Sequence, residues 1–304
     1  MKKSDWRGVF PAITTPFNPD GSLDEAFLGE HARWLIDSGC RGIVALGSLG
    51  EGATLTADEK VRVLEVLRAA LPAGVPLIAG VSGLSTRECV DLALAAQQAG
   101  CDGLMVLPPY VYRGDREETL AHFNAVIRAT PLSCMLYNNP IAYGTDLSPG
   151  DVRDLCRNDN VHALKDSSGD VRRLTALREQ MGDRLALFAG LDDMVLEATL
   201  MGSDGWIAGL VNAFPLESVA VYELARAGRV AEARALYAWF LPLLRFDTVP
   251  KFVQLIKLVQ SEVKHGSETV RAPRMPLRGA EREAALEIIQ DRIARRAHLS
   301  VIPR

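Results

Sequence analysis

The sequence predicts an α/β fold, a (β/α)8 TIM barrel followed by a C-terminal helical appendage. Eight short apolar runs recur between residues 9 and 210, and their starts lie about 20 to 34 residues apart. Amphipathic stretches with a helical period separate these runs, and only helical patterns follow residue 210. Strict alternation of strand and helix predicts a parallel sheet.

The eight apolar runs are the expected strands. They span residues 9–17, 42–48, 76–82, 103–109, 132–138, 161–168, 185–190 and 205–210. Most of them are apolar throughout rather than alternating, which predicts strands that are buried on both faces by surrounding helices. Eight such units close naturally into a barrel, and a doubly wound open sheet is the competing architecture.

Capping signals predict where the intervening helices begin and end. A hydroxyl residue followed three positions later by an acid forms a capping box at a helix start. This spacing occurs at Ser22/Glu25, Thr56/Glu59 and Ser85/Glu88. Glycine favours the left-handed residue that ends a helix, and candidates for this role are Gly39, Gly100, Gly182 and Gly202.

The C-terminal part of the chain predicts four helices, over residues 215–227, 229–244, 249–264 and 280–297. The last three are expected to pack on the barrel as an extension. No linker or low-complexity segment interrupts the sequence. We therefore expect one domain over residues 1–304, with the barrel in residues 1–225 and the helical extension in residues 226–304.

Composition restricts the classes of partner. The 304 residues are 48% hydrophobic and 24% charged, with a net charge of −4 and acids and bases interspersed. No basic tract predicts a nucleic-acid partner, and no apolar run approaches the roughly 18 residues of a membrane span. Composition therefore predicts neither a nucleic-acid nor a membrane partner, and a small-molecule substrate is expected from the motifs at the strand ends.

The cysteines and glycines give no cofactor or metal signature. The five cysteines are scattered, without metal-ligand spacing, at positions 40, 89, 101, 134 and 156. They are expected to be reduced thiols in a cytoplasmic protein, and the N-terminus lacks the apolar core of a signal peptide. Neither a phosphate-binding P-loop nor a dinucleotide-binding glycine motif is present. We therefore expect no cofactor and no metal.

Lys165 lies in the sequence VHALKDSS, near the end of the sixth expected strand. In α/β barrels the active site lies at the carboxyl ends of the strands. Burial of an ammonium group lowers its pKa, and a neutral lysine is a nucleophile toward carbonyls and imines. The alternative is an ion pair with Asp166 or another barrel carboxylate.

Tyr137 lies in LYNNP, at the end of the fifth expected strand. The neighbouring strand places it beside Lys165 at the same end of the barrel. A phenol in that position can move protons to and from a Schiff-base intermediate. The alternative is a core tyrosine whose hydroxyl reaches water.

The segment GSLGE, residues 47–51, follows the second expected strand. Glycines allow the backbone to approach a ligand, and consecutive amides form an anion-binding nest, to which Ser48 adds a hydroxyl. A substrate carboxylate is the natural ligand, and a plain βα turn is the alternative. Glu51, Asp166 and Asp192 are expected to act as caps or ion-pair partners.

These motifs in this order resemble the dihydrodipicolinate synthase/N-acetylneuraminate lyase family. The residues that carry the resemblance are GSLGE, LYNNP and LKDSSGD, and the similarity extends over nearly the whole chain. The resemblance implies a homotetrameric barrel enzyme, assembled as a dimer of dimers. It also implies roles for six residues: Lys165 as the Schiff-base lysine, Tyr137 as the proton relay, Gly47, Ser48 and Leu49 around the substrate carboxylate, and the Ile207 carbonyl as part of the site.

Three positions depart from the pattern of the synthases. Leu49 stands where the family usually has a carboxylate-binding threonine. The segment PPYVY keeps Tyr110 but has Val111 in place of the second tyrosine, which completes a relay between subunits. Ala142 stands where an arginine binds the carboxylate of the aldehyde substrate. Loss of that arginine and of the relay tyrosine argues against the lysine-pathway synthase.

One branch of the family fits these departures better. LFAGLDDMVLEA, GWIAG and KDSSGDVRRL resemble the 1-pyrroline-4-hydroxy-2-carboxylate deaminases of hydroxyproline degradation. The resemblance implies conversion of this cyclic imine and water to 2,5-dioxopentanoate and ammonia. The alternatives are a 4-hydroxy-tetrahydrodipicolinate synthase, another pyruvate or 2-keto-3-deoxy acid lyase or dehydratase, and a silent barrel that senses a 2-oxo acid.

Overall fold

A computed structural model describes residues 1–109 and 111–296 and contains eight parallel strands. Their hydrogen-bonded order is β1-β8-β7-β6-β5-β4-β3-β2, and a bridge between Ala12 and Val44 joins the two ends of this sheet. This order confirms the predicted TIM barrel and excludes a doubly wound open sheet. The strands are β1 (Gly8–Pro11), β2 (Ile43–Ala45), β3 (Leu77–Val81), β4 (Gly103–Val106), β5 (Ser133–Asn138), β6 (Val161–Asp166), β7 (Ala186–Ala189) and β8 (Gly205–Ala208).

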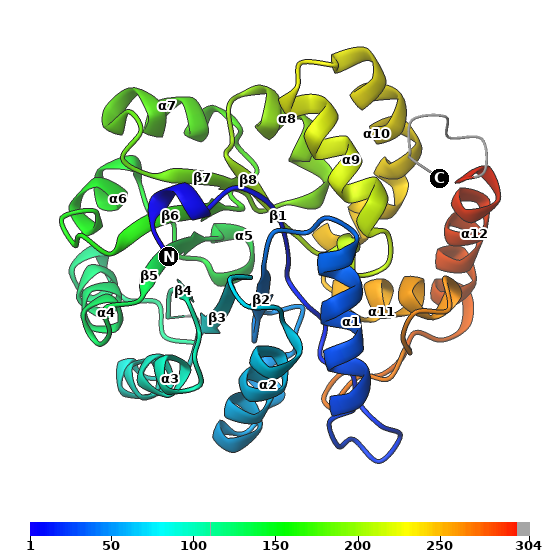
Figure 1. Cartoon of the computed structure of the whole chain (residues 1–304), viewed down its shortest axis with the longest axis horizontal. Helices are drawn as coiled ribbons and strands as arrows, with labels where there is room; N and C mark the ends of the chain where they lie inside the picture. Colours follow the sequence, from blue (N-terminus) through cyan, green and yellow to red (C-terminus); the bar gives the residue numbers. More distant parts are fainter. Residues whose placement is uncertain (110, 297–304) are drawn as a thin grey trace.

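Helices surround the strands on the outside of the barrel (Figure 1). They are α1 (Glu25–Asp37), α2 (Ala57–Ala70), α3 (Thr86–Gln98), α4 (Arg116–Arg128), α5 (Pro140–Tyr143), α6 (Pro149–Leu155), α7 (Arg172–Met181), α8 (Val195–Leu200) and α9 (Pro215–Arg226). The barrel interior is filled by large side chains, including Phe10, Met105 and Phe188, and Trp6 closes against them. Because this interior is solid, ligands have access only at its ends.

Two of the three predicted capping boxes form. The side chains of Thr56 and Ser85 each accept a hydrogen bond from the backbone amide of the acid three residues later. The carboxylate of that acid in turn accepts a hydrogen bond from the backbone amide of the cap residue. The Ser22/Glu25 box was wrong, because α1 begins at Glu25 with Asp24 as its N-cap. The four predicted helix-ending glycines all have positive φ, namely Gly39, Gly100, Gly182 and Gly202.

Three helices follow the barrel: α10 (Val230–Leu244), α11 (Phe252–Glu262) and α12 (Gly279–Arg296). Helix α10 packs on α9 and α12, and the turn η5 (Arg245–Thr248) contacts η3 (Asp192–Met194), which follows β7. Helix α11 contacts η4 (Leu210–Asn212), which follows β8. The extension therefore reaches the carboxyl ends of the last two strands (Figure 1).

The structure also describes the state of the cysteines and the character of the helices. All five cysteines are free thiols, of which Cys156 is half-buried and the other four are buried. Within residues 1–109 and 111–296, no helix combines the length and the apolar character required to cross a membrane.

Candidate active site

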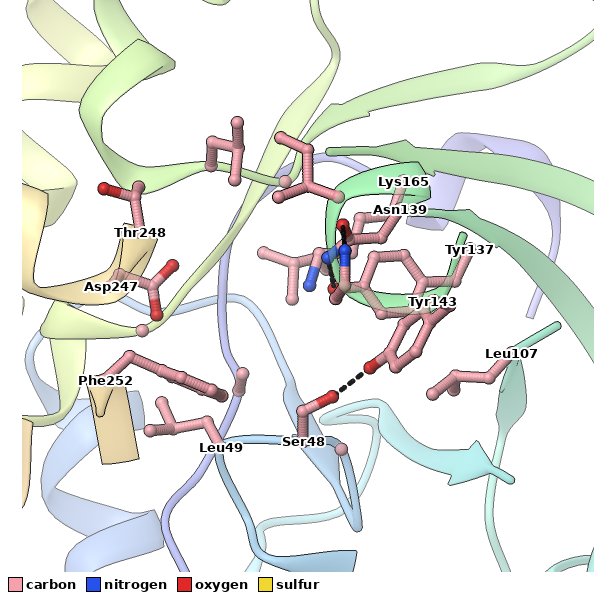
Figure 2. Close-up of a pocket in the computed structure, with 18 of the residues that line it drawn as sticks. Ser48, Leu49, Leu107, Tyr137, Asn139, Tyr143, Lys165, Asp247, Thr248 and Phe252 are labelled. Atoms are coloured by element: carbon pink, nitrogen blue, oxygen red, sulfur yellow. Dashed lines mark hydrogen bonds between the residues drawn. The ribbon is translucent and has the colours of Figure 1, made fainter. Parts of the chain in front are cut away.

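A cavity of about 750 Å³ opens at the carboxyl ends of the strands. Its walls come from the loops after β2, β5, β6, β7 and β8 and from the C-terminal extension (Figure 2). All six residues singled out from the sequence line it: Gly47, Ser48, Leu49, Tyr137, Lys165 and Ile207. The fold therefore brings together residues that are up to 160 positions apart in the chain.

Lys165 and Tyr137 occupy paired positions on β6 and β5. The lysine is 7% exposed, and its Nζ lies 4.1 Å from the centroid of the Tyr137 ring. Asp166, the ion-pair partner considered from the sequence, instead binds Arg173 at 3.1 Å and Asn138 at 3.0 Å. Among the described residues, Lys165 forms no ion pair within 4 Å, so its amino group faces the cavity without a direct counterion.

Electrostatics around Lys165 favour a nucleophilic amine. Burial lowers the pKa of Lys165, because removal of water disfavours the ammonium form. Interactions with Asp247, Tyr143 and Asp192 act in the opposite direction but do not reverse the shift. A larger fraction of the lysine is therefore neutral near pH 7 than at the surface, as Schiff-base formation requires.

The Tyr137 hydroxyl belongs to a polar network at the rim of the barrel. It accepts a hydrogen bond from Asn139 Nδ2 at 2.9 Å, and burial raises its pKa. Hydrogen bonding with the Asn139 and Tyr143 side chains partly offsets that rise. The Tyr143 hydroxyl in turn is hydrogen-bonded to Ser48 Oγ (Figure 2). A path for proton movement thus links Tyr137 to the loop after β2.

Tyr143 and Asn139 were not singled out from the sequence. Asn139 caps the short helix α5, accepting a hydrogen bond from the Ala142 amide, and Pro140 starts the helix. One helical turn later, Tyr143 reaches back over Tyr137, with ring centroids 5.7 Å apart at 85°. In the sequence, this contact between the two tyrosines is indicated by YNNPIAYG, where Tyr143 follows Pro140 by three residues.

The loop of residues 47–51 is held in a tight conformation. Both Leu46 and Glu51 have positive φ, which is costly for residues other than glycine. Gly50 has no space for a side chain, because a Cβ atom would lie 2.9 Å from the Ile13 carbonyl oxygen. Leu49 is 3% exposed and packs against Val253 and Ile256 of α11. The loop is therefore a rigid wall of the cavity.

Glu51 fixes this loop through a buried ion pair. Lys257 Nζ on α11 lies 2.6 Å from Glu51 Oε1 and also donates to the carbonyls of Thr15 and Thr269. The other Glu51 oxygen accepts from the Arg271 amide at 3.0 Å. Glu51 is thus an ion-pair partner, as expected from the sequence, while its partner Lys257 was not anticipated.

Two aspartates, Asp192 and Asp247, lie near Lys165. Asp192 is fully buried and accepts hydrogen bonds from Trp206 Nε1 and from the amides of Gly209 and Leu210. Burial raises its pKa to about 6. It therefore acts as a cap, as expected from the sequence. Asp247 comes from η5 and lines the cavity directly, and the sequence analysis missed it.

The residues that depart from the synthase pattern differ in where they lie relative to the cavity. Ala142 lines the cavity, and none of the α5 residues in the cavity lining is cationic. Val111 is 70% exposed and lies outside the cavity lining. Tyr110 lies outside the described residues. Arg274, from the segment after α11, supplies a cation at the cavity wall that the sequence analysis missed.

The fold and the site define a class. A TIM barrel with a buried, unpaired lysine and a tyrosine side by side at the carboxyl ends of its strands is the arrangement of a lysine Schiff-base lyase. Residues 5–292 match the model of the dihydrodipicolinate synthetase family. The chain belongs to this family.

Named relatives and solved structures agree with that assignment. The chain is 35% identical to a 4-hydroxy-tetrahydrodipicolinate synthase of Synechococcus sp. over 91% of this chain and 92% of the relative. It is 32% identical to the 4-hydroxy-tetrahydrodipicolinate synthase of Agrobacterium fabrum, over 93% of this chain and 96% of that relative. A dihydrodipicolinate synthase structure from Bacillus anthracis superposes with a TM-score of 0.91 at 29% identity and full coverage of both chains. The structure of a prophage protein of this family from Escherichia coli K12, solved in complex with pyruvate, superposes with a TM-score of 0.88 at 28% identity. The match covers 95% of this chain and 99% of the prophage protein.

Proposed function

We propose that this enzyme is a deaminase that converts 1-pyrroline-4-hydroxy-2-carboxylate and water to 2,5-dioxopentanoate and ammonia. The observation that carries the proposal is the apolar α5 wall at Ala142, beside the tyrosines that serve Lys165. A synthase of this family needs a cation there for its second, carboxylated substrate. A deaminase handles one small substrate and has no such need.

The first half of the reaction uses Lys165 as the nucleophile. Its neutral amine adds to C2 of the cyclic imine, and the ring opens by transimination, which frees the ring nitrogen as a primary amine on C5. The substrate carboxylate is held by the loop of Gly47, Ser48 and Leu49, with Arg274 adding positive charge nearby. The protonated Schiff base then serves as an electron sink for the following step.

Tyr137 is the proton carrier of this mechanism. It lies against Lys165 and is linked through Tyr143 to Ser48, so a proton taken from C3 has a path away from the substrate. The electron pair left at C3 expels the 4-hydroxyl as water. One water then releases the product from Lys165, and a second hydrolyses the remaining enamine nitrogen to ammonia. One water leaves and two enter, which matches the net consumption of one water.

A coupled assay tests the proposal. We expect ammonia and 2,5-dioxopentanoate from 1-pyrroline-4-hydroxy-2-carboxylate, and no condensation of pyruvate with aspartate semialdehyde. The second candidate, 4-hydroxy-tetrahydrodipicolinate synthase, is favoured by the names of the similar proteins. Turnover of the second pair alone would establish the synthase and remove the argument from Ala142.

We further propose a homotetramer in the cytoplasm. Val111 and Tyr112, 70% and 63% exposed, lie in the loop after β4, where the family resemblance implies a contact between subunits. Large apolar side chains at that exposure favour a partner surface. Light scattering after size exclusion should give four times the 33.1 kDa mass of one chain. A monomeric mass would contradict this assembly.

A further inference from the structure

The proposed reaction, on which this inference rests, needs an acid as well as a base. Hydroxide is a poor leaving group, so the oxygen on C4 must receive a proton as its bond to carbon breaks. Tyr137 and Tyr143 lie together on the α5 side of the cavity and serve C3. A separate acid is therefore required on another wall.

Asp247 is placed for this role. It enters the cavity from η5, on the opposite side from the two tyrosines (Figure 2). Its carboxyl group packs over the backbone of Gly209 and occupies the space that a side chain at that position would need. The absence of a side chain at Gly209 thus gives the aspartate its position at the carboxyl end of β8.

The Asp247 carboxyl group has fewer partners than that of Asp192. Among the described residues, its side-chain oxygens form no ion pair within 4 Å, and they accept a hydrogen bond from the Asp192 backbone amide. Asp192, by contrast, accepts from three donors and is not part of the cavity wall. Of these two acids, only Asp247 lines the cavity where a ligand would bind.

The surroundings also favour the protonated form of Asp247. Burial and the nearby negative charge of Asp192 raise the pKa of the Asp247 carboxyl well above its usual range, and Lys165 only partly opposes this. A raised carboxyl pKa is what a general acid needs.

We propose that Asp247 is the catalytic acid that protonates the departing 4-hydroxyl group. The electron pair of the C2=C3 enamine forms the C3=C4 double bond, the C4–O bond breaks, and the Asp247 proton leaves with the oxygen as water. The resulting carboxylate regains a proton from C5 when the conjugated imine isomerises to the enamine that is later hydrolysed. Atoms and charge balance without an added reagent.

Changing the leaving group tests this assignment. The 4-chloro analogue of the substrate loses chloride, which needs no proton. For Asp247→Asn we expect kcat/KM on the 4-hydroxy substrate to fall by about 10²–10⁴-fold. On the 4-chloro analogue the loss should stay below about tenfold, because Asp247 acts on the leaving oxygen. Asp91→Asn, an exposed acid on α3, is the matched control and should match the wild type on both.

Borohydride trapping with pyruvate shows whether the variant site remains assembled, and Asp247→Ser provides the same comparison if the asparagine variant does not trap. Equal losses on both substrates, or full activity on the hydroxy substrate, would overturn the role of Asp247. Failure of the wild-type enzyme to release ammonia would instead overturn the proposed function, and this inference with it.

Discussion

Lys165 and Tyr137 face one another on neighbouring strands, with the amino nitrogen 4.1 Å from the centroid of the phenol ring. This contact keeps the proposed nucleophile against the proposed proton carrier within a buried environment. Burial lowers the pKa of the amine and raises that of the phenol, so it favours the neutral form of both groups. Neutral forms are what imine formation and proton transfer both require.

Replacement of the nucleophile should abolish turnover. We expect Lys165→Ala to fold, because the lysine makes no ion pair within the described structure, and to lose all measurable ammonia release. Mass spectrometry after borohydride reduction with substrate should show an adduct on the wild type and none on the variant. Lys251→Ala, at an exposed lysine, is the control. Substantial residual activity in Lys165→Ala would exclude the Schiff-base mechanism.

Removal of the Tyr137 hydroxyl should separate adduct formation from turnover. In Tyr137→Phe the ring still packs beside Lys165, but the proton path is cut, so we expect kcat to fall by about 10²–10⁴-fold while a trapped adduct still forms. Tyr222→Phe removes a hydroxyl that donates to the Asp204 carbonyl, outside the cavity lining, and should leave kcat unchanged. Near-normal turnover in Tyr137→Phe would exclude Tyr137 as the proton carrier.

Tyr143 should matter through its contacts with Tyr137 and Ser48. In Tyr143→Phe the hydroxyl that joins them is lost, so we expect a smaller fall in kcat than in Tyr137→Phe, roughly tenfold to a hundredfold. Steady-state kinetics of the single and double phenylalanine variants measure the coupling. If the two effects simply multiply, the residues act independently and the proposed path is wrong.

The buried pair of Lys257 and Glu51 should dominate the stability of the loop after β2. Lys257→Met leaves the carboxylate of Glu51 buried without its ammonium partner, so we expect a loss of about 3–5 kcal/mol in the free energy of unfolding. Urea unfolding followed by circular dichroism measures it. Lys251→Met breaks an exposed pair with Glu281 and should cost less than about 1 kcal/mol. Equal costs for the two variants would show that burial does not set the strength of the pair.

Glu59 provides a prediction about pH. Its carboxylate caps α2 and pairs with Arg271, and these contacts lower its pKa from 4.5 to about 2. A lowered carboxyl pKa adds stability above pH 4.5 that is lost as the pH falls toward 2. We expect Glu59→Gln to cost on the order of 2 kcal/mol at pH 7 and nothing near pH 2.

The matched control for Glu59 is Glu65→Gln, at an exposed acid on the same helix. Thermal unfolding of both variants at several pH values gives the comparison. A Glu59→Gln cost that does not change with pH would show that the carboxylate charge is not the source of its stabilisation.

Much of the barrel could be predicted from the sequence alone. Continuous apolar runs, helix caps and glycines are local signals, and they placed seven of the eight strands within three residues at each end. The first expected strand, 9–17, extended six residues beyond the end of β1 (Gly8–Pro11). The capping box predicted at Ser22/Glu25 does not form, and the reason is local as well. Asp20 holds Ser22 in a turn, where the serine hydroxyl and amide both donate to its carboxylate, and the neighbouring Asp24 caps the helix instead.

The sequence also determined which side chains lie at the end of each strand, and so it indicated Lys165, Tyr137 and the loop with Ser48. It could not indicate Asp247, Lys257 or Arg274, which come from the extension beyond the last strand. Their places depend on how η5 and α11 pack on the loops after β7 and β8. That packing is set by contacts between distant residues, such as Leu49 against Ile256, and no periodic pattern in the chain records them.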